Sequence, residues 1–293
     1  MPQKALTLKS LLAQGQDLPS LPEIYIRVSE QLENEKATVQ QIGHTVQTDP
    51  AISSRLLTMV NSAFYGLPHR VSSISQAISL LGRLRLKHIL IGSVLGGIFK
   101  GIKSDDFSMQ DFWQHSIKTA IIARQLGIQS PDISEPEELF SAGLLHDIGR
   151  LILVDKMPDQ LIEVDQLEIS KRIDTIQAET EVIGFDHTMV SKGLMQQWGL
   201  PEVLCECVKN HHEVEHTGEY ADASRIIYLA NRLSQNVPPM DEDEAIEQLS
   251  NIPGWQASKI SSEAIFDACH QSEDLVFDVM ESLGMVDIEI TSE

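Results

Sequence analysis

The sequence is poor in cysteine, in aromatic residues and in long apolar runs. Three cysteines among 293 residues are too few, and odd in number, for the disulfide framework of a small secreted protein. Cys205 and Cys207 would point about 200° apart on a helix, a poor geometry for chelation, so we interpret them as packing residues. The longest apolar stretch, 89–99, has 11 residues, whereas a membrane-spanning helix needs about 20. The first ten residues lack the apolar core of a signal peptide. We therefore expect a cytoplasmic globular protein without a membrane segment.

Basic residues are also scarce, with 22 Lys and Arg against 43 Asp and Glu and a net charge of −21. Because so acidic a chain repels phosphate backbones, nucleic-acid binding is not expected. The charge is unevenly spread: residues 1–100 carry +4, residues 101–200 carry −9 and residues 201–293 carry −16. In the first third, Arg83, Arg85 and Lys87 form a basic cluster. This cluster is either an ordinary solvated helix face or a docking patch for an acidic signalling partner.

Apolar residues recur at helical spacing along most of the chain, as in Ile24, Val28 and Leu32, while strand-like alternation is scarce. A polar segment, GIKSDDF (101–107), lies where the charge balance changes sign. We therefore predict an all-α protein in three parts. These are an N-terminal helical part over 1–107, a helical core over 108–235 and an acidic, helical C-terminal extension over 236–293.

Two predicted helices of the core contain residues that could carry chemistry. Ser108, with Asp111 three residues later, predicts the start of a helix that runs to about Leu126 and stops at Gly127. A second helix is expected to run to Gly149, with His146 and Asp147 near its end.

Five of the ten histidines stand inside or at the ends of predicted helices, and one of them is followed by an aspartate. These residues are His115, His146, Asp147, His187, His211 and His212. Imidazole and carboxylate are the usual ligands of first-row metals, and a carboxylate can bridge two ions. Because adjacent helical residues point about 100° apart, His146 and Asp147 need ligands from other helices to share one ion. The other five histidines are interpreted as structural or surface residues: His44, His69, His88, His216 and His270.

The order of these residues, H … HD … H … HH, occurs among longer motifs. In the first part these are LPSLPEIYIRV (18–28), QTDPAISSRLLTMVNSAFYG (47–66) and VSSISQAISLLG (71–82). In the core they are FWQHSIKTAIIARQL (112–126), LFSAGLLHDIGRLIL (139–153), GFDHTMVSKGLMQQWGLP (184–201) and IIYLANRLS (226–234). Over about 14–235 the chain resembles the HD-related output domain (HDOD) family of bacterial signalling proteins, within the HD superfamily of metal-dependent phosphohydrolases. The resemblance implies an HD-domain-like multi-helical bundle with an additional N-terminal helical subdomain.

The resemblance also implies one or two divalent ions, such as iron or manganese. Its metal ligands would be His115, His146, Asp147 and the late-helix position Asn231, with a second set at His187, His211 and His212. In catalysis, Asp147 would bridge the cations and Arg150 would neutralise a phosphate. Arg150 also has a structural interpretation, as a cation that favours the end of a helix dipole in the last turn.

The chain departs from the superfamily pattern at three positions. Asn231 stands where an Asp is expected, and its neutral amide is a poorer metal ligand than a carboxylate. Arg150 replaces a lysine, and EVEHTGEY (213–220) follows the HH pair where the cyclic-dinucleotide-cleaving branch has Gly-Tyr-Pro. These departures favour a regulatory module that binds a partner protein or small ligand without turnover. The alternative is a metal-dependent phosphohydrolase acting on a nucleotide or cyclic dinucleotide, and a metal held only for structure is a middle case.

Overall fold

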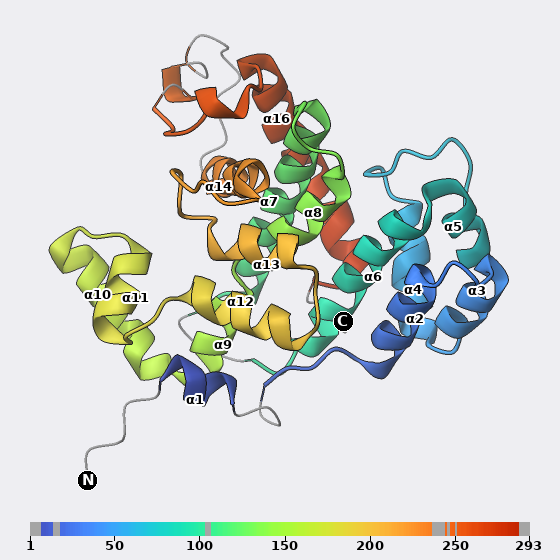
Figure 1. The fold of residues 1–293 in the computed structure, drawn as a ribbon, viewed down its shortest axis with the longest axis horizontal. Coiled ribbons are helices and arrows are strands. Elements are labelled where there is room, and N and C mark those ends of the chain that lie inside the picture. Colours follow the sequence, from blue (N-terminus) through green and yellow to red (C-terminus); the bar gives the residue numbers. More distant parts are fainter. Residues whose placement is uncertain are drawn as a thin grey trace, which may run out of the picture.

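The computed structural model describes residues 7–13, 18–102, 107–235, 244, 247–249 and 251–286. Within these ranges every regular element is a helix (Figure 1), which confirms the all-α prediction. No helix of this part of the chain combines the length and the apolar character that crossing a bilayer requires.

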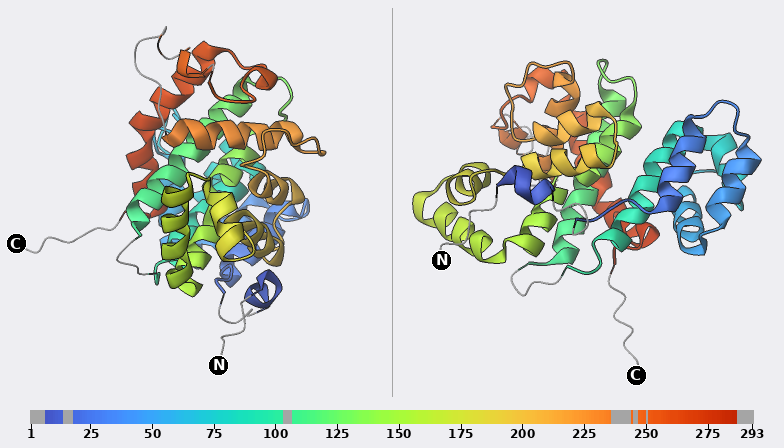
Figure 2. Two further views of the ribbon diagram at one scale, coloured as in Figure 1. Left: turned by 90° about the vertical axis from the view of Figure 1, so that its left-hand side faces the viewer. Right: turned by 60° about the horizontal axis from the view of Figure 1, so that its bottom comes forward.

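Five helices form an N-terminal bundle that stands to one side of the other helices (Figures 1 and 2). They are α2 (Glu23–Glu33), α3 (Val39–Gln47), α4 (Pro50–Val60), α5 (Ile74–Leu81) and α6 (Arg83–Ile98). Asp49 starts α4 by accepting hydrogen bonds from the backbone amides of Ala51 and Ile52, with Pro50 in the first turn. Between α5 and α6, Gly82 has a φ of +85°, a conformation that favours glycine.

The basic cluster at the start of α6 is engaged inside the protein. Arg83 donates hydrogen bonds to the backbone carbonyls at and beyond the end of α2, including that of Asn34 at 2.7 Å. Lys87 forms an ion pair with Glu33, and Arg85 lies 3.4 Å from Glu137. A cation at a helix C-terminus satisfies carbonyls that have no intrahelical donor. A partner that docks here would compete with these contacts.

Helix α7 (Met109–Gln129) is the central helix of the core. It packs against α8 (Pro136–Leu145), α14 (Ala221–Gln235) and α16 (Ser262–Leu283). Ser108 caps it as predicted, because its hydroxyl accepts a hydrogen bond from the amide of Asp111 at 3.1 Å. The predicted stop at Gly127 is wrong. A Cβ there would lie 2.5 Å from a side-chain carbon of Leu139, so this glycine permits close packing of α8 instead of ending the helix.

The remaining helices complete the core around α7. They are α9 (Ile148–Lys156), α10 (Pro158–Lys171), α11 (Thr175–Val182), α12 (His187–Gln197) and α13 (Glu202–Lys209). Helix α12 packs against both α9 and α13, while α10 and α11 form a hairpin that projects from the core (Figure 1). The short α1 (Leu8–Leu12) lies on α12, and a 3-10 turn, Gln256–Ser258, precedes α16.

Helix α16 contacts both parts of the molecule, because it packs against α7 of the core and against α4 and α6 of the N-terminal bundle. Its apolar side, which includes Val279 and Leu283, is fully buried. The part boundaries at 107 and 235 stay predictions, and residues 236–243 of the predicted extension lie outside the described residues.

Candidate metal centre

The fold brings together six of the seven predicted metal ligands. His115 lies on α7, His187 starts α12, and His211 and His212 follow the end of α13. His146 and Asp147 occupy the junction between α8 and α9. The result is two groups of potential ligand atoms that share Asp147: one with His187, His211 and His212, the other with His115 and His146.

The junction at His146 and Asp147 corrects the prediction of one continuous helix to Gly149. Helix α8 ends at Leu145 and α9 begins at Ile148, so the two adjacent residues form the turn between the helices. Ser191 of α12 bridges the break, because its hydroxyl donates to the carbonyl of His146 at 3.2 Å and accepts from the amide of Gly149 at 2.8 Å. A Cβ on Gly149 would lie 2.1 Å from the carbonyl oxygen of His187. Packing of α12 therefore sets the turn that presents the His-Asp pair.

The two oxygens of Asp147 face different histidines. Oδ1 lies 3.2 Å from Nε2 of His187 and 3.3 Å from Nε2 of His211. Oδ2 lies 3.4 Å from Nε2 of His146 and 3.9 Å from Nε2 of His115. This arrangement is suited to a carboxylate that bridges two cations.

Hydrogen bonds at the opposite ring nitrogens fix these imidazoles. Nδ1 of His146 donates to the carbonyl of Gly143, and Nδ1 of His211 donates to the carbonyl of Val208, both at 2.7 Å. A carbonyl only accepts, so each Nδ1 carries the proton and each Nε2 presents a lone pair.

His187 and His115 are held in the same way by side chains. Nδ1 of His187 donates to Oε2 of Glu179 at 2.8 Å, and the same oxygen accepts the backbone amide of His187 at 2.7 Å. Nδ1 of His115 lies 3.1 Å from the hydroxyl of Ser234, which donates to the carbonyl of Asn231 and accepts from Thr119. Because the proton of Ser234 is already used, Nδ1 of His115 is the donor and its Nε2 also presents a lone pair.

The lone pairs therefore face other acceptors. Nε2 of His115 lies 3.1 Å from Nε2 of His146. Nε2 of His187, Nε2 of His211 and Oδ1 of Asp147 are buried without a hydrogen-bond partner. Buried acceptors that face one another are costly unless a proton or a cation lies between them.

Protons do not satisfy the whole cluster at neutral pH. Burial, reinforced by the charge of His146, lowers the pKa of His115 to about 4, and burial also lowers the pKa of His211 to about 4. Burial and the two neighbouring histidines lower the pKa of His212 still further. Burial disfavours the His187 cation, but the carboxylates of Asp147 and Glu179 outweigh it and raise the pKa of His187 to about 9.

Asp147 itself is held ionised. Burial opposes its charge, but the adjacent histidines outweigh burial and hold its pKa well below the usual value. Metal binding requires neutral imidazoles and an ionised carboxylate. The cluster thus fits a divalent metal: His115, His146 and Asp147 would hold one ion, and Asp147, His187, His211 and His212 would hold the other.

Arg150 and Asn231 are the two remaining predicted site residues. Arg150 lies in the first turn of α9, so the interpretation as a last-turn cation is wrong. Its guanidinium is 42% exposed and lies 3.9 Å from Oδ2 of Asp147. Asn231 is buried on α14, where its amide oxygen lies 3.5 Å from Nε2 of Gln235 and its backbone carbonyl accepts from Ser234. Ser234 thus connects the backbone carbonyl of Asn231 to Nδ1 of His115.

Three supporting residues were missed by the sequence reasoning: Glu179, Ser191 and Ser234. Glu179 is 1% exposed, which is unusual for a carboxylate and marks it as a partner of His187. In the sequence it is one of two glutamates of AETEV, eight residues before His187. Local pattern does not separate it from Glu181, which lies in an exposed ion pair with Lys171.

Comparison with known proteins identifies the family and supports the fold. The family model of the HDOD domain matches residues 18–214. A candidate phosphohydrolase of Shewanella amazonensis SB2B is similar in structure, with 24% identity, a TM-score of 0.76, and 94% of this chain and 97% of that chain covered. An HDOD domain protein of unknown function from Geobacter sulfurreducens has 21% identity and a TM-score of 0.73, with 96% and 98% covered.

The chain belongs to the HDOD domain family, since the family model matches well over half of its length. In sequence it is also 26% identical over 203 residues to an uncharacterised protein of Treponema pallidum (strain Nichols). That match covers 69% of this chain but only 39% of the relative, so this chain corresponds to about two fifths of the relative's length.

Proposed function

We propose that this protein is a signalling module of the HDOD family that holds one or two divalent metal ions and acts by binding a partner protein or small ligand without turnover. The observation that carries the metal is the set of buried acceptors around Asp147, in which the Nδ1 atoms of four histidines are engaged and their Nε2 atoms face inward. When bound, such ions supply Lewis acidity and charge. The protein's own contribution is to orient the ligands, while burial keeps His115, His211 and His212 deprotonated and His187 gives up its proton when the ion binds.

Two observations favour binding without turnover. Asn231 removes one negative charge from the position where the superfamily has an aspartate. His146, Asp147, His187 and His211 are all nearly inaccessible to solvent, with exposures of 5% or less. A substrate would have to approach past His115, His212 or Arg150, which are the more exposed members.

Arg150 favours the second candidate, a metal-dependent phosphohydrolase. It is an exposed cation beside the buried carboxylate, at the place where a phosphate could be neutralised. The candidate phosphohydrolase of Shewanella amazonensis has the same fold. In this alternative Asp147 would position the ions and Arg150 would bind the phosphate.

The metal content of untagged protein, purified without chelator, tests the proposal. We expect one to two equivalents of a first-row metal per chain, reduced by at least half in His211→Ala. His44→Ala is the matched control, because His44 is exposed and lies outside both ligand groups. Protein that contains no metal even after incubation with excess manganese, iron or zinc would refute the metal part of the proposal.

Hydrolysis of bis-p-nitrophenyl phosphate by the metal-loaded protein separates the two candidates. A regulatory module shows no turnover above the level of Asp147→Asn. Turnover that is lost in Asp147→Asn and in Arg150→Ala, and that increases in Asn231→Asp, would establish the phosphohydrolase instead.

A partner that binds the basic cluster and a cytoplasmic location remain proposals. Arg85→Gln tests the docking patch, because it removes the charge of a side chain that is 49% exposed without placing a carboxylate beside Glu137, whereas Arg83 also caps α2. Loss of a pulled-down complex in Arg85→Gln, with metal content and stability unchanged, would support the patch. An unchanged complex would remove it.

A further inference from the structure

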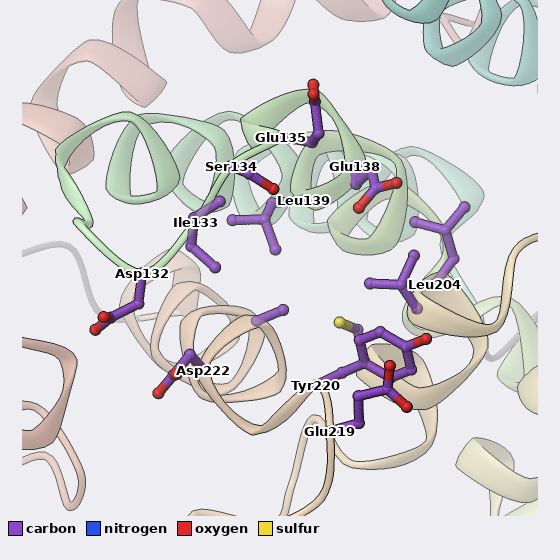
Figure 3. Close-up of a pocket in the computed structure, with 13 residues that line it drawn as sticks. Asp132, Ile133, Ser134, Glu135, Glu138, Leu139, Leu204, Glu219, Tyr220 and Asp222 are labelled. Carbon is purple, nitrogen blue, oxygen red and sulfur yellow. The ribbon is translucent and has the colours of Figure 1, made fainter.

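A cavity lies away from the metal centre, between the N-terminal end of α8 and the start of α14 (Figure 3). The turn before α8, helix α13 and the segment around Tyr220 also line it. Its volume of 380 Å³ falls within the range of about 300–1,000 Å³ that is typical of small-ligand sites. The metal-centre residues are not among those that line it.

The floor of this cavity is apolar. It is formed by Leu139, Leu204 and Cys207, which are almost completely buried. Burial raises the pKa of the Cys207 thiol to about 12, so this side chain is neutral. Beside Cys207 and Ala223 lies Ser224, whose buried hydroxyl is a hydrogen-bond neighbour of the Cys207 thiol. The floor therefore suits an aliphatic group.

The rim of the cavity is acidic on opposite sides. Glu135 and Glu138 stand on one side, and Glu219 stands on the other beside the ring of Tyr220 (Figure 3). Two further carboxylates at the rim are neutralised, because Asp132 pairs with Lys259 and Asp222 pairs with Arg225.

Glu135, Glu138 and Glu219 have no such partner. Among the described residues, none of the three forms an ion pair. Burial, together with the charge of Glu135, raises the pKa of Glu138. Glu138 is half-buried, whereas Glu135 and Glu219 are exposed. Neighbouring carboxylates repel one another, and a cation between them relieves this repulsion. Tyr220 adds an aromatic surface, which also favours cations.

We propose that this cavity binds a small aliphatic amine, with its carbon chain on the apolar floor and its ammonium group between the carboxylates of Glu138 and Glu219. The amine would be the small ligand of the proposed regulatory function. The inference rests on that part of the proposed function and is independent of the metal centre. Charge complementarity selects an amine over a neutral or anionic ligand of the same size.

Calorimetric titration of the full chain with 1,5-diaminopentane tests the proposal, and 1,5-pentanediol serves as the neutral probe. We expect saturable binding of the diamine and no binding of the diol. Each removed carboxylate is expected to weaken binding about two- to fivefold, so Glu138→Gln/Glu219→Gln should weaken it about tenfold. The matched control is Glu163→Gln on α10, an exposed glutamate outside the cavity.

A steric variant, Ala223→Leu, should block the cavity without changing its charge. Circular dichroism verifies that each variant is folded. Absence of diamine binding at about 10 mM would overturn the proposal. Equal binding of the diol, or equal weakening in Glu163→Gln, would overturn it as well.

Two further measurements separate this site from its alternatives. If a lysine-containing tripeptide binds and the diamine does not, the cavity takes a protein side chain and the small-amine proposal is wrong. Repetition of the titration after metal removal with a chelator should leave diamine affinity unchanged. Metal content, measured on the same samples, reports on the metal centre alone, so that failure of one proposal is distinguishable from failure of the other.

Discussion

A buried ion pair of the core, which also contacts the N-terminal part, allows a quantitative prediction. Glu137, in the first turn of α8, is 4% exposed and accepts a hydrogen bond from Nε of Arg124 at 2.9 Å. The hydroxyl of Tyr65 donates to its other oxygen at 3.4 Å, and Arg85 lies 3.4 Å away. The guanidinium of Arg124 stacks over Phe64 and Tyr65, at 4.8 and 5.6 Å from the ring centres. The pair therefore joins α7 and α8 to the N-terminal bundle.

Glu137→Gln removes the charge of this carboxylate and keeps its shape. Loss of one partner of a buried pair typically costs about 3–5 kcal/mol, because the other charge stays buried without compensation. We expect the lower end, about 3 kcal/mol, since the amide oxygen can still accept from Arg124. Burial and the charge of Glu137 raise the pKa of Tyr65 well above its usual value, so its hydroxyl remains a donor at neutral pH.

Urea denaturation followed by circular dichroism measures this loss in the free energy of unfolding. The control is Glu273→Gln, which breaks an exposed pair with Lys118 and should cost less than about 1 kcal/mol. The double variant Glu137→Gln/Arg124→Met should be more stable than the sum of the two single changes predicts. A loss below about 1 kcal/mol for Glu137→Gln, or simple additivity, would refute the reasoning.

Two further perturbations follow from local geometry. Gly149→Ala places a methyl group against the carbonyl of His187 and against Ser191, so we expect a loss of about 1–3 kcal/mol and a weaker affinity for metal. His88 is buried, and burial together with the charge of Lys87 lowers its pKa to about 4. Between pH 6.5 and 4 the unfolded state binds more protons at His88 than the folded state does. The free energy of unfolding therefore decreases as the pH is lowered, by up to about 3 kcal/mol from this residue, and His88→Gln should reduce this decrease.

Matched control variants distinguish the effects of Gly149→Ala and His88→Gln from those of any substitution of the same kind. Gly97→Ala has open space around the new methyl group and should stabilise α6 by up to about 1 kcal/mol. Equal stability and equal metal content of Gly149→Ala and Gly97→Ala would contradict the steric argument for the close approach of α9 to α12. His44→Gln, at an exposed position, should leave the pH dependence unchanged. An equal acid sensitivity in wild type and His88→Gln would contradict the assignment to His88.

The candidate metal ligands were recognisable in the sequence because their chain order and surrounding motifs resemble those of the HD superfamily. His115, His146 and Asp147 appear in helical motifs whose chain order survives without any knowledge of packing. The turn between His146 and Asp147 was not predictable, because both residues are compatible with a helix and the contact that interrupts it comes from Ser191 of α12. The local sequence pattern does not predict such a tertiary contact.

The residues that support the candidate ligands were also not predictable from the local sequence pattern. Glu179 and Ser234 hold histidines that are 8 and 119 residues away in the sequence. Gly127 has the residue type of a helix stop, but its position against Leu139 makes it a packing glycine. Sequence periodicity predicts that helices exist. Whether a glycine ends a helix or permits close packing depends on which helices become neighbours in the fold.

Helix α16 bears on how the protein acquires its fold during synthesis. The buried side of this helix is shared by α7 of the core and by α4 and α6 of the N-terminal bundle, yet it follows all of them in the chain. A nascent polypeptide can form the earlier helices while still attached to the ribosome, but their apolar surfaces remain partly uncovered until residues 262–283 have left the exit tunnel. Until then the chain exposes apolar surface to other molecules, so we expect its dependence on chaperones to last until α16 has emerged from the ribosome.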